Sequence, residues 1–192
     1  VIVVDADIQS HFLDPNDAGT SAVMDDAATA TVVSCSVPRV SHLDSDDGEH
    51  ETRCAMHEAR STNFRFFTSK SNALECGATG PVKMDGFKVF TFVAGQMVKF
   101  LKSFGSDFDM FVPHRANLYM IRRLAKSPDL EDKLLAAPQN AQFANPGSSS
   151  IPATPAFAGR PGTALIAGFG AGLSASAGIV TLADAFTGQI VE

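Results

Sequence analysis

The stretch Phe111-Val112-Pro113-His114-Arg115-Ala116-Asn117 decides the fold, together with Asn145 and the turn Gly168-Phe169-Gly170-Ala171-Gly172, which follow it in that order. The apolar residues before Pro113 predict a short buried strand, and the proline fixes the backbone where the strand ends at His114. A neutral imidazole and a primary amide can donate two hydrogen bonds to one oxyanion, and a glycine turn offers backbone N–H groups to another. This order of residues is typical of part of an acyl-transfer site.

The segments around this stretch alternate between strand and helix patterns. Apolar residues between Phe87 and Phe104 recur every three or four positions and stop before Gly105, which predicts an amphipathic helix. Further helices are expected over 117–126 and from Ser127-Pro128-Asp129 to about 136, and strands over 1–7, 20–24, 29–34, 163–167 and 174–182. The pattern predicts an α/β domain in which a mixed sheet is layered with helices.

At 192 residues with 45% hydrophobic content, the chain is expected to form one domain spanning 1–192. Residues 39–81 are polar and predict a long surface excursion. The sequence opens without methionine on the apolar run Val1 to Val4, which we interpret as the middle of a fold. A fragment, a processed chain or one half of a split protein is therefore expected.

Three observations limit where the protein acts and what it binds. No apolar run is long enough to span a membrane, and the three cysteines show no CxxC spacing, so free thiols in the cytoplasm are expected. The net charge of −6 disfavours nucleic-acid binding. Seven basic residues between Lys88 and Lys126 favour either an acidic partner or phosphate, or simply a solvated helix face.

On these motifs the chain resembles the C-terminal half of β-ketoacyl-acyl-carrier-protein synthase III, a family of thiolase-like condensing enzymes. Val112 to Asn117 resembles the family's Pro-His-Gln-Ala-Asn, and Asn145 to Pro152 resembles its Asn-Thr-Ser-Ala-Ala-Ser-Ile-Pro. Asp85 to Phe90 resembles its Gly-x-x-x-Phe helix start, and Gly168 to Ser174 follows its terminal glycine turn. The resemblance also covers the first strand and the loop to Ala28, and implies a thiolase-like half-fold.

The resemblance implies that His114 and Asn145 are catalytic and that backbone groups of Gly170, Ala171 and Gly172 meet an oxyanion. It further implies that Gly86, Phe90, Ala116 and Asn117 line the passage for the pantetheine arm. The expected reaction is decarboxylative condensation of an acyl thioester with malonyl-acyl carrier protein (ACP), in fatty-acid or polyketide biosynthesis. Acyl-coenzyme A (CoA), ACP and a dimer partner are the expected partners, with no cofactor and no metal.

The family's nucleophilic cysteine precedes the first strand of this chain, so the resemblance implies a Cys-bearing half or companion subunit, without which the chain is expected to be inactive. Cys35, Cys54 and Cys76 lack the setting of an activated thiol. The absent cysteine and the loss of two family glycines in Met24 to Ala28 favour an alternative, a non-catalytic subunit or scaffold of a carrier-dependent complex. Tyr119 stands where the family has an arginine, at a position that bears on phosphate or carrier contacts. A related acyltransferase without decarboxylation is a third hypothesis.

A metal site is a further alternative for the polar excursion. His42, His50, Cys54 and His57 could gather around an ion, but they lack the paired-ligand spacing of a zinc knuckle. Solvated loop residues are the favoured interpretation, so no metal ligand is assigned.

Overall fold

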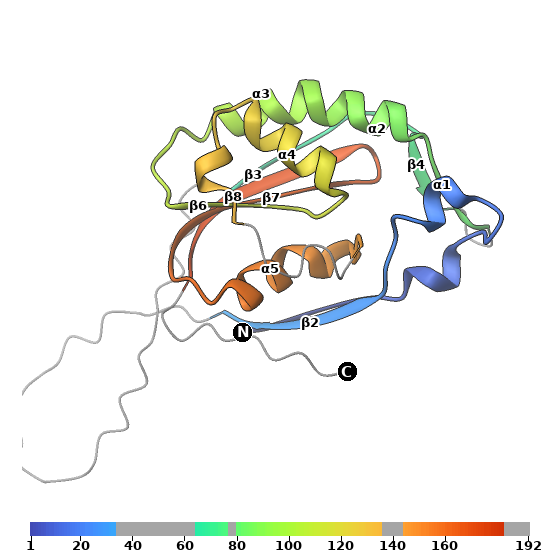
Figure 1. Cartoon of the computed structure of the whole chain (residues 1–192), viewed down its shortest axis with the longest axis horizontal. Helices are drawn as coiled ribbons and strands as arrows, with labels where there is room; N and C mark the ends of the chain where they lie inside the picture. The colour runs from blue at the N-terminus through green and yellow to red at the C-terminus, as the bar shows by residue number, and fades with distance from the viewer. Residues whose placement is uncertain (34–63, 77–79, 136–143, 183–192) are drawn as a thin grey trace, which may run out of the picture.

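The structure, a computed structural model, describes residues 1–33, 64–76, 80–135 and 144–182. These residues form alternating layers of helices and strands (Figure 1). Helices α2 (Gly86–Phe92), α3 (Val98–Lys102) and α4 (Leu118–Lys126) cover one face of a four-stranded sheet. Helix α5 (Ser150–Ala158) covers the opposite face, and a two-stranded sheet lies beyond α5.

The four-stranded sheet has the order β3 (Arg65–Thr68), β8 (Ser174–Leu182), β7 (Gly162–Gly170) and β6 (Met110–Pro113). Strand β6 is parallel to β7, and the other two pairs are antiparallel, which makes the sheet mixed as expected. All four residues of β6 are buried, as a continuous apolar strand covered on both faces should be. The apolar run before His114 therefore forms an edge strand beneath helices on both sides.

A hydrophobic core fills the space between the sheet and the helices α2 to α4. Phe92, Met97 and Leu101 on the helices pack in one cluster with Phe111 and Leu165 on the strands. The predicted helix of 87–104 is confirmed, but its middle is a π-helical turn, η2 (Val93–Met97), which joins α2 to α3. A smaller cluster of Met110, Val112 and Ala164 packs with Ile151 of α5 on the other face of the sheet.

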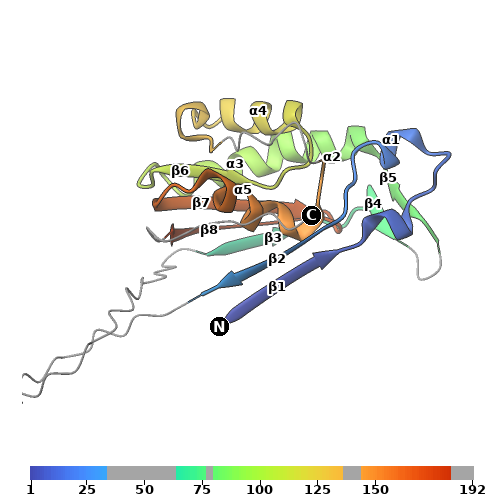
Figure 2. The same cartoon turned by 60° about the horizontal axis from the view of Figure 1, so that its bottom comes forward.

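No described element covers the outer face of the two-stranded sheet (Figure 2), and exposed side chains along it are apolar. It pairs β1 (Ile2–Asp7) with β2 (Ala27–Val32) in antiparallel register, with Ile2 opposite Val32. Ile2 and Val4 are each 68% exposed and Val32 is 76% exposed. On the inner side, Ser149 donates its hydroxyl to the carbonyls of Asp5 and Ala27, which fixes the sheet to the start of α5.

Several sequence expectations need correction. The strand expected over 20–24 is replaced by a short helix, α1 (Ala18–Ser21), because the Asp17 side chain caps its first backbone N–H groups. The helix expected after Ser127 is only a 3₁₀ turn, η3 (Glu131–Lys133), since Asp129 takes a left-handed φ of 58° and stops a continuous helix.

The polar excursion of 39–81 is also corrected in part. Residues 34–63 and 77–79 lie outside the described residues, but β3 within the excursion pairs with β8, and Ala73 is fully buried. Strand β4 (Leu74–Cys76) pairs with β5 (Val82–Met84). The remaining short elements are η1 (Gln9–Phe12) and η5 (Gly147–Ser149). Within the described ranges, no helix is both long and apolar enough to cross a bilayer.

Candidate active site

His114 is held where β6 ends. Its backbone N–H donates to the Ala167 carbonyl at 2.7 Å, which continues the pairing of β6 with β7 past Pro113. Its Nδ1 lies 2.6 Å from the Ser150 hydroxyl, and the Phe169 ring meets the imidazole edge-on with centroids 5.1 Å apart. The imidazole orientation is therefore fixed by backbone, hydroxyl and aromatic contacts together.

The surroundings of His114 favour the neutral imidazole. Burial lowers the pKa of His114 from 6.5 to about 4, because desolvation penalises the charged ring, while a backbone hydrogen bond with Gly147 and the charge of Asp7 act weakly in the opposite direction. A ring with a pKa near 4 is uncharged at neutral pH. It has one N–H donor and one acceptor nitrogen, which agrees with a hydrogen-bond donor to a substrate oxygen.

Asn145 is fixed through its backbone to the N-terminal segment of the chain. Its N–H donates to the Val23 carbonyl at 2.8 Å, and its own carbonyl accepts from the Asp25 N–H at 2.9 Å. Its side-chain Oδ1 accepts from the Gly147 N–H at 3.1 Å, and its Nδ2 donates to the Met24 sulfur at 3.7 Å. Since sulfur is a weak acceptor, the amide N–H₂ group keeps donor capacity for a stronger acceptor.

One cavity of about 730 Å³ brings the two candidate catalytic residues together. His114 and Asn145 both line it, with Gly170 and Ala171 from the end of β7 and the turn after it. Gly168 and Phe169, expected in the glycine turn, instead belong to β7, so the turn itself is Ala171 to Leu173. Gly172 does not line the cavity; it has φ of +124°, and its carbonyl accepts from the Ser71 N–H at 2.7 Å.

The predicted pantetheine residues are not all placed together. Ala116 and Asn117 line a second cavity of about 220 Å³ beside the buried Arg115. The Asn117 side chain accepts from the Met120 N–H at 2.8 Å and so caps α4. Gly86 and Phe90 line neither of these two cavities, and the Phe90 ring stacks on Tyr119 with centroids 6.0 Å apart.

Sequence reasoning missed three residues that hold this site. Asp7 Oδ2 accepts from both the N–H and the hydroxyl of Ser148, each at 2.6 Å, and Gln9 donates to the Asn145 carbonyl at 3.1 Å. Ser150 contacts His114 as described above. A carboxylate at the end of an apolar strand was a signal for Asp7, whereas nothing in the spacing distinguished Ser150 within its serine run.

Most residues of the cysteine and metal alternatives lie outside the described ranges. Cys35, Cys54, His42, His50 and His57 lie outside the described residues, and Cys76 lies in β4. In the portion of the chain that is described, no three His, Cys, Asp or Glu side chains gather as a metal site.

Comparison with known proteins gives one consistent match. Residues 104–182 match the family model described as 3-oxoacyl-acyl-carrier-protein (ACP) synthase III C terminal. The beta-ketoacyl-acyl-carrier-protein synthase III of Tropheryma whipplei is 28% identical over 187 residues, which cover 90% of this chain and 55% of that protein. A Streptomyces coelicolor synthase III is 28% identical, over 95% of this chain and 58% of its own length. The chain thus spans little more than half the length of these curated relatives.

Solved structures agree with the sequence matches. The 3-oxoacyl-(acyl carrier protein) synthase III of Pseudomonas aeruginosa aligns with all of this chain and 59% of its own, with 25% identity and a TM-score of 0.71. The synthase of Burkholderia xenovorans shares the fold with a TM-score of 0.74 over 97% of this chain and 57% of its own, at 22% identity. Residues 104–182 of this chain therefore match the C-terminal domain of 3-oxoacyl-acyl-carrier-protein synthase III, and the chain has the thiolase-like α/β fold of these synthases.

Proposed function

We propose that this chain supplies the His and Asn donors for decarboxylative condensation of an acyl thioester with malonyl-ACP, in fatty-acid or polyketide biosynthesis. The observation that carries the proposal is the shared cavity, in which a neutral His114 and the amide of Asn145 lie with the end of β7. Two neutral donors aimed at one oxygen are what a thioester enolate needs.

The first chemical step is decarboxylation of the malonyl thioester. The C–C bond to the carboxylate breaks and carbon dioxide leaves. The electron pair of this bond stays with the thioester and forms an enolate, whose negative oxygen accepts hydrogen bonds from His114 and Asn145. Because His114 remains neutral, it stabilises this oxygen without transferring a full proton. Each donor contributes on the order of 2–4 kcal/mol to such a transition state.

The second step joins the two carbon chains. The enolate carbon attacks the carbonyl of an acyl group held as a thioester on cysteine; the tetrahedral oxyanion then collapses, and the cysteine leaves as a thiolate. Backbone N–H groups near Gly170, Ala171 and Gly172 are proposed to meet that oxyanion. Among these, Gly170 and Ala171 line the cavity beside His114.

The nucleophilic cysteine is proposed to come from a Cys-bearing half or companion subunit, and a reducing cytoplasm keeps such a thiol free. The apolar outer face of β1 and β2, with Ile2, Val4 and Val32 more than two-thirds exposed, is the proposed contact surface. Exposed apolar surface of this kind favours association with a protein partner. The proposed homo- or heterodimer forms through the same face or through another part of the complete protein.

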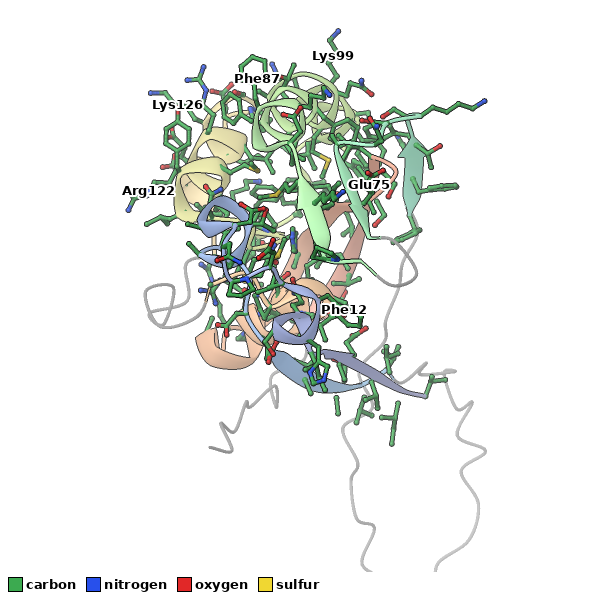
Figure 3. All side chains as sticks on the ribbon, turned by 90° about the vertical axis from the view of Figure 1, so that its right-hand side faces the viewer. Phe12, Glu75, Phe87, Lys99, Arg122 and Lys126 are labelled. Atoms are coloured by element: carbon green, nitrogen blue, oxygen red, sulfur yellow. The ribbon has the colours of Figure 1, made fainter. Side chains whose placement is uncertain are left out.

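The carrier substrates are proposed to approach from the helical side of the molecule. Exposed Arg122, Lys126 and Lys99 lie on this side with the aromatic Phe87 (Figure 3). A basic surface with exposed aromatic groups suits an acidic carrier protein or the phosphates of CoA. The cavity beside Ala116 and Asn117 is the proposed start of the pantetheine passage, with Gly86 and Phe90 on the neighbouring helix.

Intact-mass spectrometry under denaturing conditions comes first, to find whether a Cys-bearing polypeptide accompanies this chain. The complex is then supplied with acyl-CoA and radiolabelled malonyl-ACP, and released carbon dioxide is measured. His114→Ala and Asn145→Ala are each expected to slow release by roughly 30- to 900-fold, the equivalent of about 2–4 kcal/mol. His11→Ala is the matched control, since His11 is exposed in η1 and is not among the residues that line the cavity. Release at the wild-type rate from both variants would overturn the proposal.

The same assay separates the two other functions. For a non-catalytic scaffold, favoured by the loss of two family glycines in Met24 to Ala28, His114→Ala would change only assembly of the complex. For a related acyltransferase, acyl transfer would proceed without any release of carbon dioxide from the malonyl thioester.

A further inference from the structure

Ser150 is placed to act on the ring of His114 without facing a substrate. It begins α5, is fully buried, and has its Oγ 2.6 Å from His114 Nδ1. The Ser150 carbonyl accepts from the Thr154 hydroxyl at 2.9 Å, so the backbone of this first helical turn is also held. We infer that Ser150 is a positioning residue that places the single N–H of the neutral His114 ring on Nε2.

The direction of the hydrogen bond follows from burial. Within the described residues, the Ser150 hydroxyl has its hydrogen-bond contact with His114 Nδ1. A buried hydroxyl hydrogen without an acceptor is costly, whereas an unused lone pair on the hydroxyl oxygen is tolerated better. The Ser150 O–H therefore donates to Nδ1. Because Nδ1 must offer its lone pair to accept, the ring hydrogen lies on Nε2.

This assignment deepens, and for its catalytic consequence rests on, the function proposed above. A neutral imidazole has only one N–H, so a hydrogen on Nδ1 would leave Nε2 unable to donate to an enolate oxygen. The Phe169 ring restrains the imidazole plane, but an aromatic contact does not distinguish the two nitrogens. Ser150 makes the distinction at Nδ1, and a second polar contact of the ring is with the backbone of Gly147.

The test measures the ring directly. The ¹⁵N shifts of imidazole nitrogens distinguish protonated from unprotonated atoms, and comparison with His114→Gln assigns the signals of His114 among the five histidines of the chain. The wild-type chain at neutral pH is expected to show a protonated Nε2 and an unprotonated Nδ1. In Ser150→Ala, the ratio of this tautomer to the other is expected to fall by about 2- to 12-fold, the range that one neutral hydrogen bond supports.

Ser149→Ala provides a closely matched control. Ser149 is the preceding residue and is equally buried, but its hydroxyl bonds to backbone carbonyls of β1 and β2. This variant should leave the His114 shifts unchanged, and Ser150→Thr, which retains a hydroxyl, should restore the wild-type ratio. Backbone ¹H–¹⁵N spectra confirm that each variant is folded.

Two outcomes would overturn the inference: a wild-type ring protonated on Nδ1, or an identical tautomer ratio in wild type and Ser150→Ala. The experiment needs no substrate, so it is independent of the condensation assay. If the tautomer responds to Ser150 while carbon dioxide release does not respond to His114, the positioning role stands and the proposed function fails.

Discussion

Replacing Gly147 with alanine should damage the loop that carries Asn145. Gly147 has φ of +56°, and its N–H donates to Asn145 Oδ1. A methyl group there would collide with Asp7 Oδ2 and would lie 2.7 Å from Gln9 Nε2 and 2.8 Å from Asp7 Cγ. Asp7 cannot move away freely, because two hydrogen bonds of 2.6 Å tie it to Ser148.

Two physical effects set the size of the change. A left-handed backbone costs an L-residue about 1–2 kcal/mol relative to glycine. Forcing a methyl group into occupied space costs about 1–3 kcal/mol more. Gly147→Ala is therefore expected to lower the free energy of unfolding by about 2–5 kcal/mol.

Gly159 separates these two effects. It has the same φ of +56°, but among the described residues no neighbouring heavy atom would lie within 4 Å of an added methyl group. Gly159→Ala should therefore cost only the backbone term, about 1–2 kcal/mol. Urea unfolding of both variants at equal protein concentration measures the difference, expected to be about 1–3 kcal/mol. Equal destabilisation by the two substitutions would refute the crowding of Asp7 and Gln9 around the site.

Four further predictions follow from the same contacts. The pKa of His114 is about 4 in the folded chain and 6.5 ordinarily, so the unfolded chain binds the proton first as pH falls. The free energy of unfolding should therefore drop by up to about 3 kcal/mol between pH 6.5 and 4. His114→Gln should remove this part of the pH dependence of the free energy of unfolding. Leu165→Ala, at a fully buried position of β7, should cost about 2–5 kcal/mol in urea unfolding, and a smaller loss would contradict the packing of the core. Val4→Lys should weaken association with a Cys-bearing partner at least tenfold by sedimentation while leaving unfolding within about 0.5 kcal/mol, since Val4 is 68% exposed. Reversing the charge of Arg122 and Arg123 together should weaken ACP binding several-fold at low salt and less at high salt, whereas a salt-independent affinity would argue against electrostatic docking.

The sequence predicted best what depends on local periodicity and backbone chemistry. The apolar run before Pro113 predicted β6, and three- and four-residue spacing predicted the helix that begins near Gly86. The strand over 174–182 was predicted with its observed bounds because the segment consists of small residues followed by β-branched ones, with no proline or charged residue to interrupt it. Family motifs also predicted that His114 and Asn145 would act together, and the structure places both on one cavity.

What the sequence could not predict depends on contacts between distant segments or on competing local chemistry. The Asp17 cap turned a strand pattern into α1, and the left-handed Asp129 ended a helix pattern. The place of β3 in the sheet depends on pairing with β8, more than 100 residues away. The hydroxyl of Ser150 was indistinguishable from its serine neighbours until α5 brought it to His114.

The loop that carries Asn145 is held by residues near the N-terminus of the chain. This connectivity gives the two halves of the site, around Asn145 and around His114, different local stabilities. The Ala144 and Ser148 N–H groups donate to the carboxylates of Asp25 and Asp7, across 119 and 141 residues of sequence. By contrast, the Asp109 N–H just before β6 donates to the Thr163 hydroxyl of β7, across 54 residues. Closing the longer loops costs more chain entropy. A local opening that releases residues 1–33 would therefore free the Asn145 amide while the His114 imidazole stays on its sheet. Amide hydrogen exchange should accordingly be faster around Asn145 than around His114, and a partner that binds β1 and β2 would complete the site by suppressing that opening.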